Sequence, residues 1–246
     1  MKTMKTMLLL FVSVIAITSV STTNVFAQDF RNVPTHHSTI KSNSCFAVPT
    51  PKINLSNCKM AHTEIHFADM TGANLSKTVA KNALFYNVNL SGANLQNAVL
   101  SGGSFAYSNL SGADLRGADL RYADFYHTNL SGADLSGANT IGARFPGVDF
   151  SNARLVALDL SHTNIIGANL YNADLQNVIL TNVDMRNAVF TSANLGSANL
   201  ANSDITGGSF EDADLTGTNV GGLDYSGADM SCHGNPVCRI VDKDTT

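Results

Sequence analysis

The sequence predicts an all-β solenoid, a chain wound into a rod with four short extended sides in each coil. Three observations predict it. A large apolar side chain recurs at every fifth residue from Leu55 to Met230, Gly and Asn recur two residues after it, and the type of apolar residue changes with a period of twenty. Strands repeat apolar residues every second position and amphipathic helices every 3.6, so neither element fits a period of five.

The first 27 residues have the layout of a secretory signal peptide. Lys2 and Lys5 give a basic start, residues 7–20 form an apolar run, and small residues precede a cleavage position after Ala27. The alternative is a membrane anchor, but the run is shorter than the roughly 20 residues that a spanning helix needs. We therefore expect a periplasmic or secreted protein, with no membrane insertion after cleavage of residues 1–27.

Composition indicates a globular chain and argues against nucleic acid as a partner. Of the 246 residues, 44% are hydrophobic and 14% are charged, which favours a folded chain over a disordered one. Cleavage removes Lys2 and Lys5 and takes the formal charge from −4 to −6. A chain this mildly acidic lacks the clustered Lys and Arg of a nucleic-acid-binding surface.

Two terminal segments break the five-residue register, residues 28–52 before it and residues 231–246 after it. The ends of a solenoid expose unpaired backbone groups and need covers. We therefore expect residues 28–52 to form an N-terminal cap segment and residues 231–246 a C-terminal cap and tail. The adjacent His36 and His37 are better explained as part of a polar tail than as a metal site.

The repeat between these segments comprises 36 consecutive five-residue units without an insertion. Its register positions are all apolar or aromatic except Thr140, and Ala80 is the only small one. A second, mostly small residue stands two positions earlier, on the same side of an extended segment. Each unit thus directs one large and one small side chain inward, while the residue between them, usually Asn or Asp, faces outward.

Corners are expected two residues after each large side chain. Between residues 72 and 227 there are 32 such positions, of which 14 are Gly and 9 are Asn. These residues adopt the left-handed backbone conformation most easily. A corner in nearly every unit describes a coil rather than a sheet of long strands.

Two columns of the register show how many sides make one coil, because one is Leu throughout and the other, ten residues later, has no Leu. The two columns are Leu55, Leu75, Leu95, Leu115, Leu135, Leu155, Leu175, Leu195 and Leu215, and Ile65, Phe85, Phe105, Phe125, Phe145, Ile165, Met185, Ile205 and Tyr225. A period of twenty predicts four units per coil and about nine coils. At about 4.8 Å per coil the rod is roughly 43 Å long.

Individual units resemble the pentapeptide repeat family, as in Ala-Asp-Leu-Arg-Gly at residues 113–117 and Ala-Asn-Leu-Ser-Lys at residues 73–77. The resemblance implies a right-handed quadrilateral β-helix over residues 53–230. Two units depart from the pattern with Leu158 and Leu223 where Ala is usual. We expect local bulging at these two residues, and at the departures Thr140 and Ala80, rather than failure of the coil.

The four Cys residues lie near the two ends of the repeat. In an exported chain an even number of Cys favours disulfides. A rod keeps Cys58 and Cys232 apart, so we expect the pairs Cys45–Cys58 and Cys232–Cys238. Zinc is the alternative at the second pair, where His233 adds a third ligand, but no fourth ligand stands at a usual spacing.

One outer edge carries an unusual set of aromatic residues near the Phe column. They are His66, Phe67, Tyr86, Tyr107, Tyr126 and His127. Their intervals near twenty predict one exposed strip along the first half of the rod, and contiguous exposed aromatic surface often marks a binding site. Scattered surface aromatic residues are the alternative.

Acidic residues continue along the same side of the rod, at Asp184, Asp204 and Asp224, with Asp124 upstream. Stacked carboxylates could hold a cation such as Ca²⁺. Single carboxylates without flanking oxygen ligands more often form a solvated face, and we predict no metal site here.

The function expected from these features is that of an exported, non-catalytic scaffold or binding module. Its partner would be a protein or glycan of the cell envelope, without nucleic acid or a cofactor, and a monomer is favoured over a dimer. The family resemblance offers an alternative, because quinolone-resistance members mimic DNA and bind gyrase. That role needs a strongly acidic cytoplasmic rod. No nucleophile–base motif or dinucleotide fingerprint indicates an enzyme.

Overall fold

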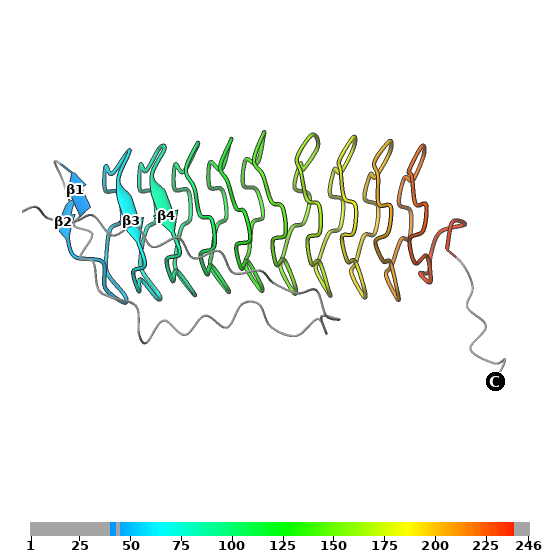
Figure 1. Cartoon of the computed structure of the whole chain (residues 1–246), viewed down its shortest axis with the longest axis horizontal. Helices are drawn as coiled ribbons and strands as arrows, with labels where there is room; N and C mark the ends of the chain where they lie inside the picture. The colour runs from blue at the N-terminus through cyan, green and yellow to red at the C-terminus, as the bar shows by residue number, and fades with distance from the viewer. Residues whose placement is uncertain (1–39, 43–44, 239–246) are drawn as a thin grey trace, which may run out of the picture.

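The computed structural model describes residues 40–42 and 45–238, which form one long rod of stacked coils (Figure 1). None of these residues is helical. Four three-residue strands are present: β1 (Ile40–Ser42), β2 (Cys45–Ala47), β3 (Glu64–His66) and β4 (Leu84–Tyr86). β1 pairs with β2 antiparallel at the start of the rod, and β3 pairs with β4 in parallel.

Successive coils pair in parallel at intervals of twenty residues, as Asn74 does with Asn94 and Asn94 with Asp114. The backbone N–H of Leu75 donates to the carbonyl of Asn94 at 2.7 Å, and the same contact recurs around the rod. A coil therefore contains four five-residue sides. We call each stack of equivalent sides a wall.

The core is a column of side chains enclosed by the four walls. Nearly all register residues are buried, as are most of the small residues two positions before them. Within it the rings of Phe85, Phe105, Phe125 and Phe145 stack with centroids 5.0–5.1 Å apart, within the range that aromatic pairs favour.

The last coil departs from the expected burial. Tyr225 stands at a register position but is 40% exposed, and Val220 is only half-buried. Among the described residues, the one bridge beyond this coil joins Asp214 to His233. Because no complete coil follows, the inward side of the rod is partly open to solvent at Val220 and Tyr225, whereas Met230 in the same coil is buried.

The corners have the predicted backbone. The residue two positions after the register residue has a positive φ in every unit from residue 57 to residue 227. At most corners the register carbonyl also accepts the N–H three residues on, as Met70 does from Ala73 at 3.0 Å. This combination is typical of a type II turn, which needs a left-handed third residue.

The ladder has a single gap between residues 59 and 229, where Asn139 does not pair with Asp159. The Thr140 hydroxyl instead donates to the Asp159 carbonyl at 2.5 Å, and the coils stand further apart here than elsewhere (Figure 1). The gap adjoins the two departures Thr140 and Leu158. The bulging expected at Ala80 and Leu223 is absent, since backbone pairing there is regular.

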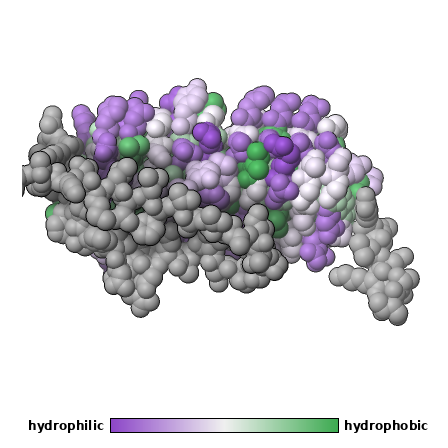
Figure 2. Space-filling model, viewed as in Figure 1, coloured by the Kyte–Doolittle hydropathy of each residue, from purple (hydrophilic) through white to green (hydrophobic). Residues whose placement is uncertain are grey.

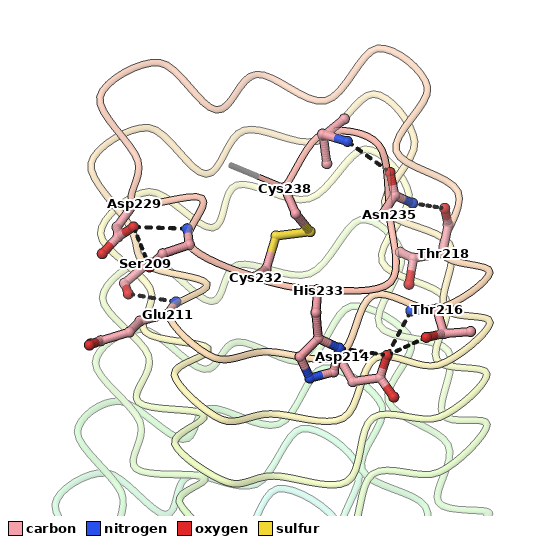
Figure 3. Close-up of a disulfide and its surroundings, with 12 residues drawn as sticks. Ser209, Glu211, Asp214, Thr216, Thr218, Asp229, Cys232, His233, Asn235 and Cys238 are labelled. Atoms are coloured by element: carbon pink, nitrogen blue, oxygen red, sulfur yellow. Dashed lines mark hydrogen bonds and ion pairs between the residues drawn. A yellow bond between two sulfur atoms is a disulfide. The ribbon is translucent and has the colours of Figure 1, made fainter. Parts of the chain in front are cut away.

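A disulfide stands at each end of the described rod, pairing Cys45 with Cys58 and Cys232 with Cys238. In the C-terminal segment, Asn235 Nδ2 donates to the Thr218 carbonyl at 2.9 Å and holds the segment against the last coil (Figure 3). The signal peptide, the histidine pair at 36–37 and the tail after residue 238 lie outside the described residues. No helix long and apolar enough to span a membrane occurs in the described part of the chain.

Candidate binding surface

The six predicted aromatic residues form one continuous exposed strip, here called the aromatic strip. Phe67, Tyr86, Tyr107 and Tyr126 are 44%, 39%, 42% and 38% exposed. Ring centroids lie 5.8 Å apart from Phe67 to Tyr86, 5.6 Å from Tyr86 to Tyr107 and 5.4 Å from Tyr107 to Tyr126. His66 lies 6.2 Å from Tyr86, and His127 stacks on Tyr107 at 5.8 Å.

The strip lies on one corner of the rod because its residues occupy the two turn positions after Ile65, Phe85, Phe105 and Phe125. Within this corner Ala106 is nearly buried, and Tyr107 at the next position fills the space between Tyr86 and Tyr126. Alternation between the two turn positions therefore keeps the rings in contact from coil to coil.

Three strip residues have a left-handed backbone, with φ of 53° at Phe67, 60° at Tyr107 and 49° at His127. This conformation is unfavourable for bulky side chains, and most other corners place Gly or Asn there. Strained backbone positions tend to concentrate at functional sites. The strip therefore combines local strain with exposed aromatic surface.

Polar groups flank the rings. The pKa of Tyr107 is raised, first by partial removal of its hydroxyl from water and then by the neighbouring Tyr126. On the adjoining wall, Asp124 stands between Ser104 and Arg144 in neighbouring coils. Arg144 lies next to Asp124 on this wall, in the following coil. Even so, Arg144 forms no ion pair within the described part of the chain.

The strip ends at Pro146 and Gly147, in the coil after Tyr126 and His127. A Cβ at Gly147 would lie 2.6 Å from the His127 ring, so the glycine provides the space in which this ring lies. Tyr122 belongs to the preceding corner, where its ring covers Gly142 in the same way. It is 69% exposed and stacks against none of the strip rings.

The acidic column is organised by hydrogen bonds and one arginine. Arg186 donates to both carboxylate oxygens of Asp184 at 2.9 and 2.8 Å, and its Nε lies 3.9 Å from Asp204. Asp184, Asp204 and Asp224 also each accept a backbone N–H two residues on. Among the described residues, no three metal-ligating side chains converge.

The zinc alternative at the C-terminal end finds no support in the arrangement of its residues. Cys232 and Cys238 bond to each other, while His233 Nδ1 lies 3.5 Å from Asp214 Oδ1 (Figure 3). The ligands that this alternative required are thus engaged in other contacts.

The remaining surface is mostly polar where the described residues are visible, with hydrophobic residues in small separate groups (Figure 2). Arg116 and Asp114 form a typical exposed pair, with two hydrogen bonds of 2.9 and 2.6 Å. These bonds, helped by Gln96, lower the pKa of Asp114 to about 2. Outside the aromatic strip, charged residues form such pairs within their own turns, which accounts for them without a ligand.

The model of the pentapeptide repeat family matches this chain in six segments with 8 copies of the repeat. The matched segments are residues 51–76, 67–102, 104–137, 128–165, 168–207 and 193–231. The chain belongs to the pentapeptide repeat family. Membership carries the right-handed β-helix that the resemblance implied.

Solved structures of other pentapeptide repeat proteins are similar to this one. HetL, involved in heterocyst differentiation regulation in the cyanobacterium Nostoc sp. strain PCC 7120, is 24% identical over 74% of this chain and 86% of its own, with a TM-score of 0.39. QnrB1, a plasmid-mediated fluoroquinolone resistance protein, is 18% identical over 74% and 91%, with a TM-score of 0.41. No curated protein matches the chain.

Proposed function

We propose that this pentapeptide repeat protein is an exported, non-catalytic binding module that acts in the periplasm or outside the cell. The aromatic strip is its binding surface, and the partner is a protein or glycan of the cell envelope. The rod acts as a monomer, without a cofactor, and the cleaved form does not insert into the membrane.

The observation that carries the proposal is the continuity of the aromatic strip. Four exposed rings lie in consecutive contact along one corner, with centroid separations of 5.4–5.8 Å. Elsewhere along the described rod, exposed aromatic residues such as Tyr171 and Tyr225 make no ring stacks. Contiguous apolar surface of this kind often binds a partner.

Export is supported by the N-terminal sequence and by the cysteines. Residues 1–27 have the signal-peptide layout, and the two disulfides are bonds that persist in oxidising compartments.

The test of export is the intact mass of the protein recovered from periplasmic and cytoplasmic fractions, before and after reduction. We expect a periplasmic species that begins at Gln28 and is lighter by four hydrogens until it is reduced. A full-length cytoplasmic species with four free thiols would contradict export.

A second candidate function is DNA mimicry directed at gyrase, and one observation favours it. Residues 174–238 contain eight acidic side chains but only one basic side chain, Arg186. An acidic end of a rod can imitate a charged duplex. A supercoiling assay tests it: inhibition of gyrase that is lost on replacing Asp204 and Asp224 with Asn would favour this function over envelope binding.

A further inference from the structure

The outward Asn and Asp residues share one hydrogen bond to the backbone, and Asp124 is the only one of them that lacks it. Between residues 54 and 229, 25 of the outward positions are Asn or Asp. The side-chain oxygen accepts the backbone N–H two residues on at 24 of them. The exception is Asp124, whose Oδ1 is buried and has no partner among the described residues.

A second unpartnered acceptor, Asn87 Oδ1, belongs to the strip corner itself, next to the wall of Asp124. Only three buried side-chain atoms of the described chain lack a hydrogen bond: Asn87 Oδ1, Asp124 Oδ1 and Ser136 Oγ. Asn87 directly follows Tyr86, and Asp124 lies two residues before Tyr126. Buried polar groups are normally paired, and each exception calls for a partner such as a bound water, ion or ligand.

The surface therefore combines aromatic rings with two acceptors that lack donors. Asn87 and Asp124 are half-buried as whole residues, so part of each residue is exposed beside the rings to a ligand on the strip. Arg144, without an ion pair, adds free donors one coil away from Asp124. A ligand for this corner must offer both flat apolar faces and hydroxyl donors.

We propose that the aromatic strip binds a neutral polysaccharide chain that lies along the rod axis. The Tyr rings stack against the C–H faces of the sugar rings, and sugar hydroxyls donate to Asn87 and Asp124 and accept from Arg144. This proposal rests on the proposed function and specifies its partner as a glycan.

Spacing and charge favour a neutral glycan over other ligands. Tyr86 and Tyr126 belong to coils two steps apart, a separation of about 10 Å at the usual strand spacing, which suits stacking on a linear chain of sugar rings. Arg144 disfavours a cationic ligand near Asp124, and Glu64 with Asp124 disfavours an anionic one. A peptide supplies fewer donors per unit length than a polyhydroxylated chain.

The experiment titrates the full-length protein with hexasaccharides of β-1,4-linked glucose and of β-1,4-linked N-acetylglucosamine, and follows tyrosine fluorescence and heat. The chain has no Trp, and three of its six Tyr residues lie in the strip, so the intrinsic signal reports on this surface. We expect at least one hexasaccharide to bind and to change the emission.

Three variants locate the site. Replacing Tyr86, Tyr107 and Tyr126 together with Ser should abolish binding, while Tyr171→Ser, an exposed tyrosine on another corner, should not change it. Asp124→Ala should weaken binding about tenfold, a loss of roughly 1.4 kcal/mol. Because Asp124 forms no turn hydrogen bond, its melting temperature should stay the same, which separates a binding role from a structural one.

The outcomes distinguish this inference from the proposed function. Absence of binding to either hexasaccharide and to purified envelope polysaccharide, combined with strip-dependent capture of a protein, overturns the glycan and leaves the binding module. Strip-dependent self-association in sedimentation velocity assigns the surface to a second copy and overturns both the glycan and the monomer. Loss of every strip-dependent interaction overturns the proposed function as well.

Discussion

The outward Asn and Asp residues determine how each five-residue unit turns. At every Asn or Asp outward position except Asp124, the side-chain oxygen accepts the N–H of the first turn residue, as Asn129 Oδ1 does from Ser131 at 2.9 Å. Asn and Asp form such turns readily because their short side chains reach the backbone two residues on. The preference for these residues therefore has a local structural cause, separate from any ligand.

A matched pair of substitutions tests this role of the outward residue. Asn129→Ala should lower the free energy of unfolding by about 0.5–1.5 kcal/mol, the net value of one hydrogen bond. Asp124→Ala should have no such cost, because Asp124 Oδ1 has no partner to lose. Urea unfolding of both variants measures the difference, and an equal loss of stability would contradict the distinction between the two sites.

Asp114 gives a pH-dependent prediction at the same scale. Its pKa of about 2 is lowered chiefly by the hydrogen bond from Arg116. A lowered pKa stabilises the folded state above the unfolded value of about 3.9, and that contribution is lost as the pH falls towards 2. Arg116→Ser should raise the Asp114 pKa and reduce the stability lost between pH 5 and pH 2.5.

Carboxyl-carbon NMR checks the pKa of Asp114, and urea unfolding at the two pH values checks stability. Arg116 is exposed, so the total cost of Arg116→Ser at neutral pH should stay below about 1 kcal/mol. An unchanged Asp114 pKa in the variant would show that Arg116 does not lower it.

At the scale of the coil, two serines complete turns that would otherwise be open. Val88 N–H donates to Ser108 Oγ at 2.9 Å, and Ser108 Oγ donates to the Phe85 carbonyl at 2.5 Å. Ser203 connects Val183 and Leu180 in the same way. In both cases a side chain from the next coil takes the place of a direct turn hydrogen bond, so neighbouring coils depend on each other.

Ser108→Ala should therefore cost more than removal of an ordinary buried hydroxyl. It leaves the Val88 N–H and the Phe85 carbonyl unpaired, a loss of about 2–6 kcal/mol at about 1–3 kcal/mol for each group. Thr128→Val is the control. It removes the hydroxyl that donates to the Phe105 carbonyl, but this carbonyl still accepts the Ser108 N–H at 3.0 Å. Thermal unfolding of the two variants should rank Ser108→Ala as the less stable, and the reverse order would contradict the account.

The five-residue periodicity predicted the coil because each side of the coil must bury one large side chain. Every inward position repeats at five residues and every stacked contact at twenty, so the core columns and corners could be inferred from the sequence. The hydrogen bonds of the outward residues could not, since Asp124 and Asn129 look alike in sequence and differ only in backbone contacts. Tyr225 was predicted to be buried, but in the last coil no further coil covers it, and it is 40% exposed.

Across the whole molecule, stability is close to one-dimensional because each coil contacts only its neighbours. The stacked Phe rings and the parallel bridges transmit this dependence along the rod. The single gap between Asn139 and Asp159 interrupts the ladder on one wall only, while the other three walls continue across it. Position along the rod should thus decide how far a local defect spreads.

Two lysine substitutions at fully buried positions test this dependence on position. Leu115 is 0% exposed in the first half of the rod and Met230 is 1% exposed in its last coil. Burying a charge is costly at both sites, and losing the apolar side chain adds about 2–5 kcal/mol. Leu115→Lys removes support from the coils on both sides, whereas Met230→Lys leaves the preceding coils supported.

Hydrogen exchange should accordingly show loss of protection across several coils around Leu115→Lys, with a large fall in melting temperature. For Met230→Lys the loss should be confined to residues 211–231, and most of the rod should melt as in the wild type. Cys232 and Cys238 should still pair in Leu115→Lys, since six residues separate them locally. Identical exchange patterns in the two variants would mean that the rod unfolds as a single cooperative unit.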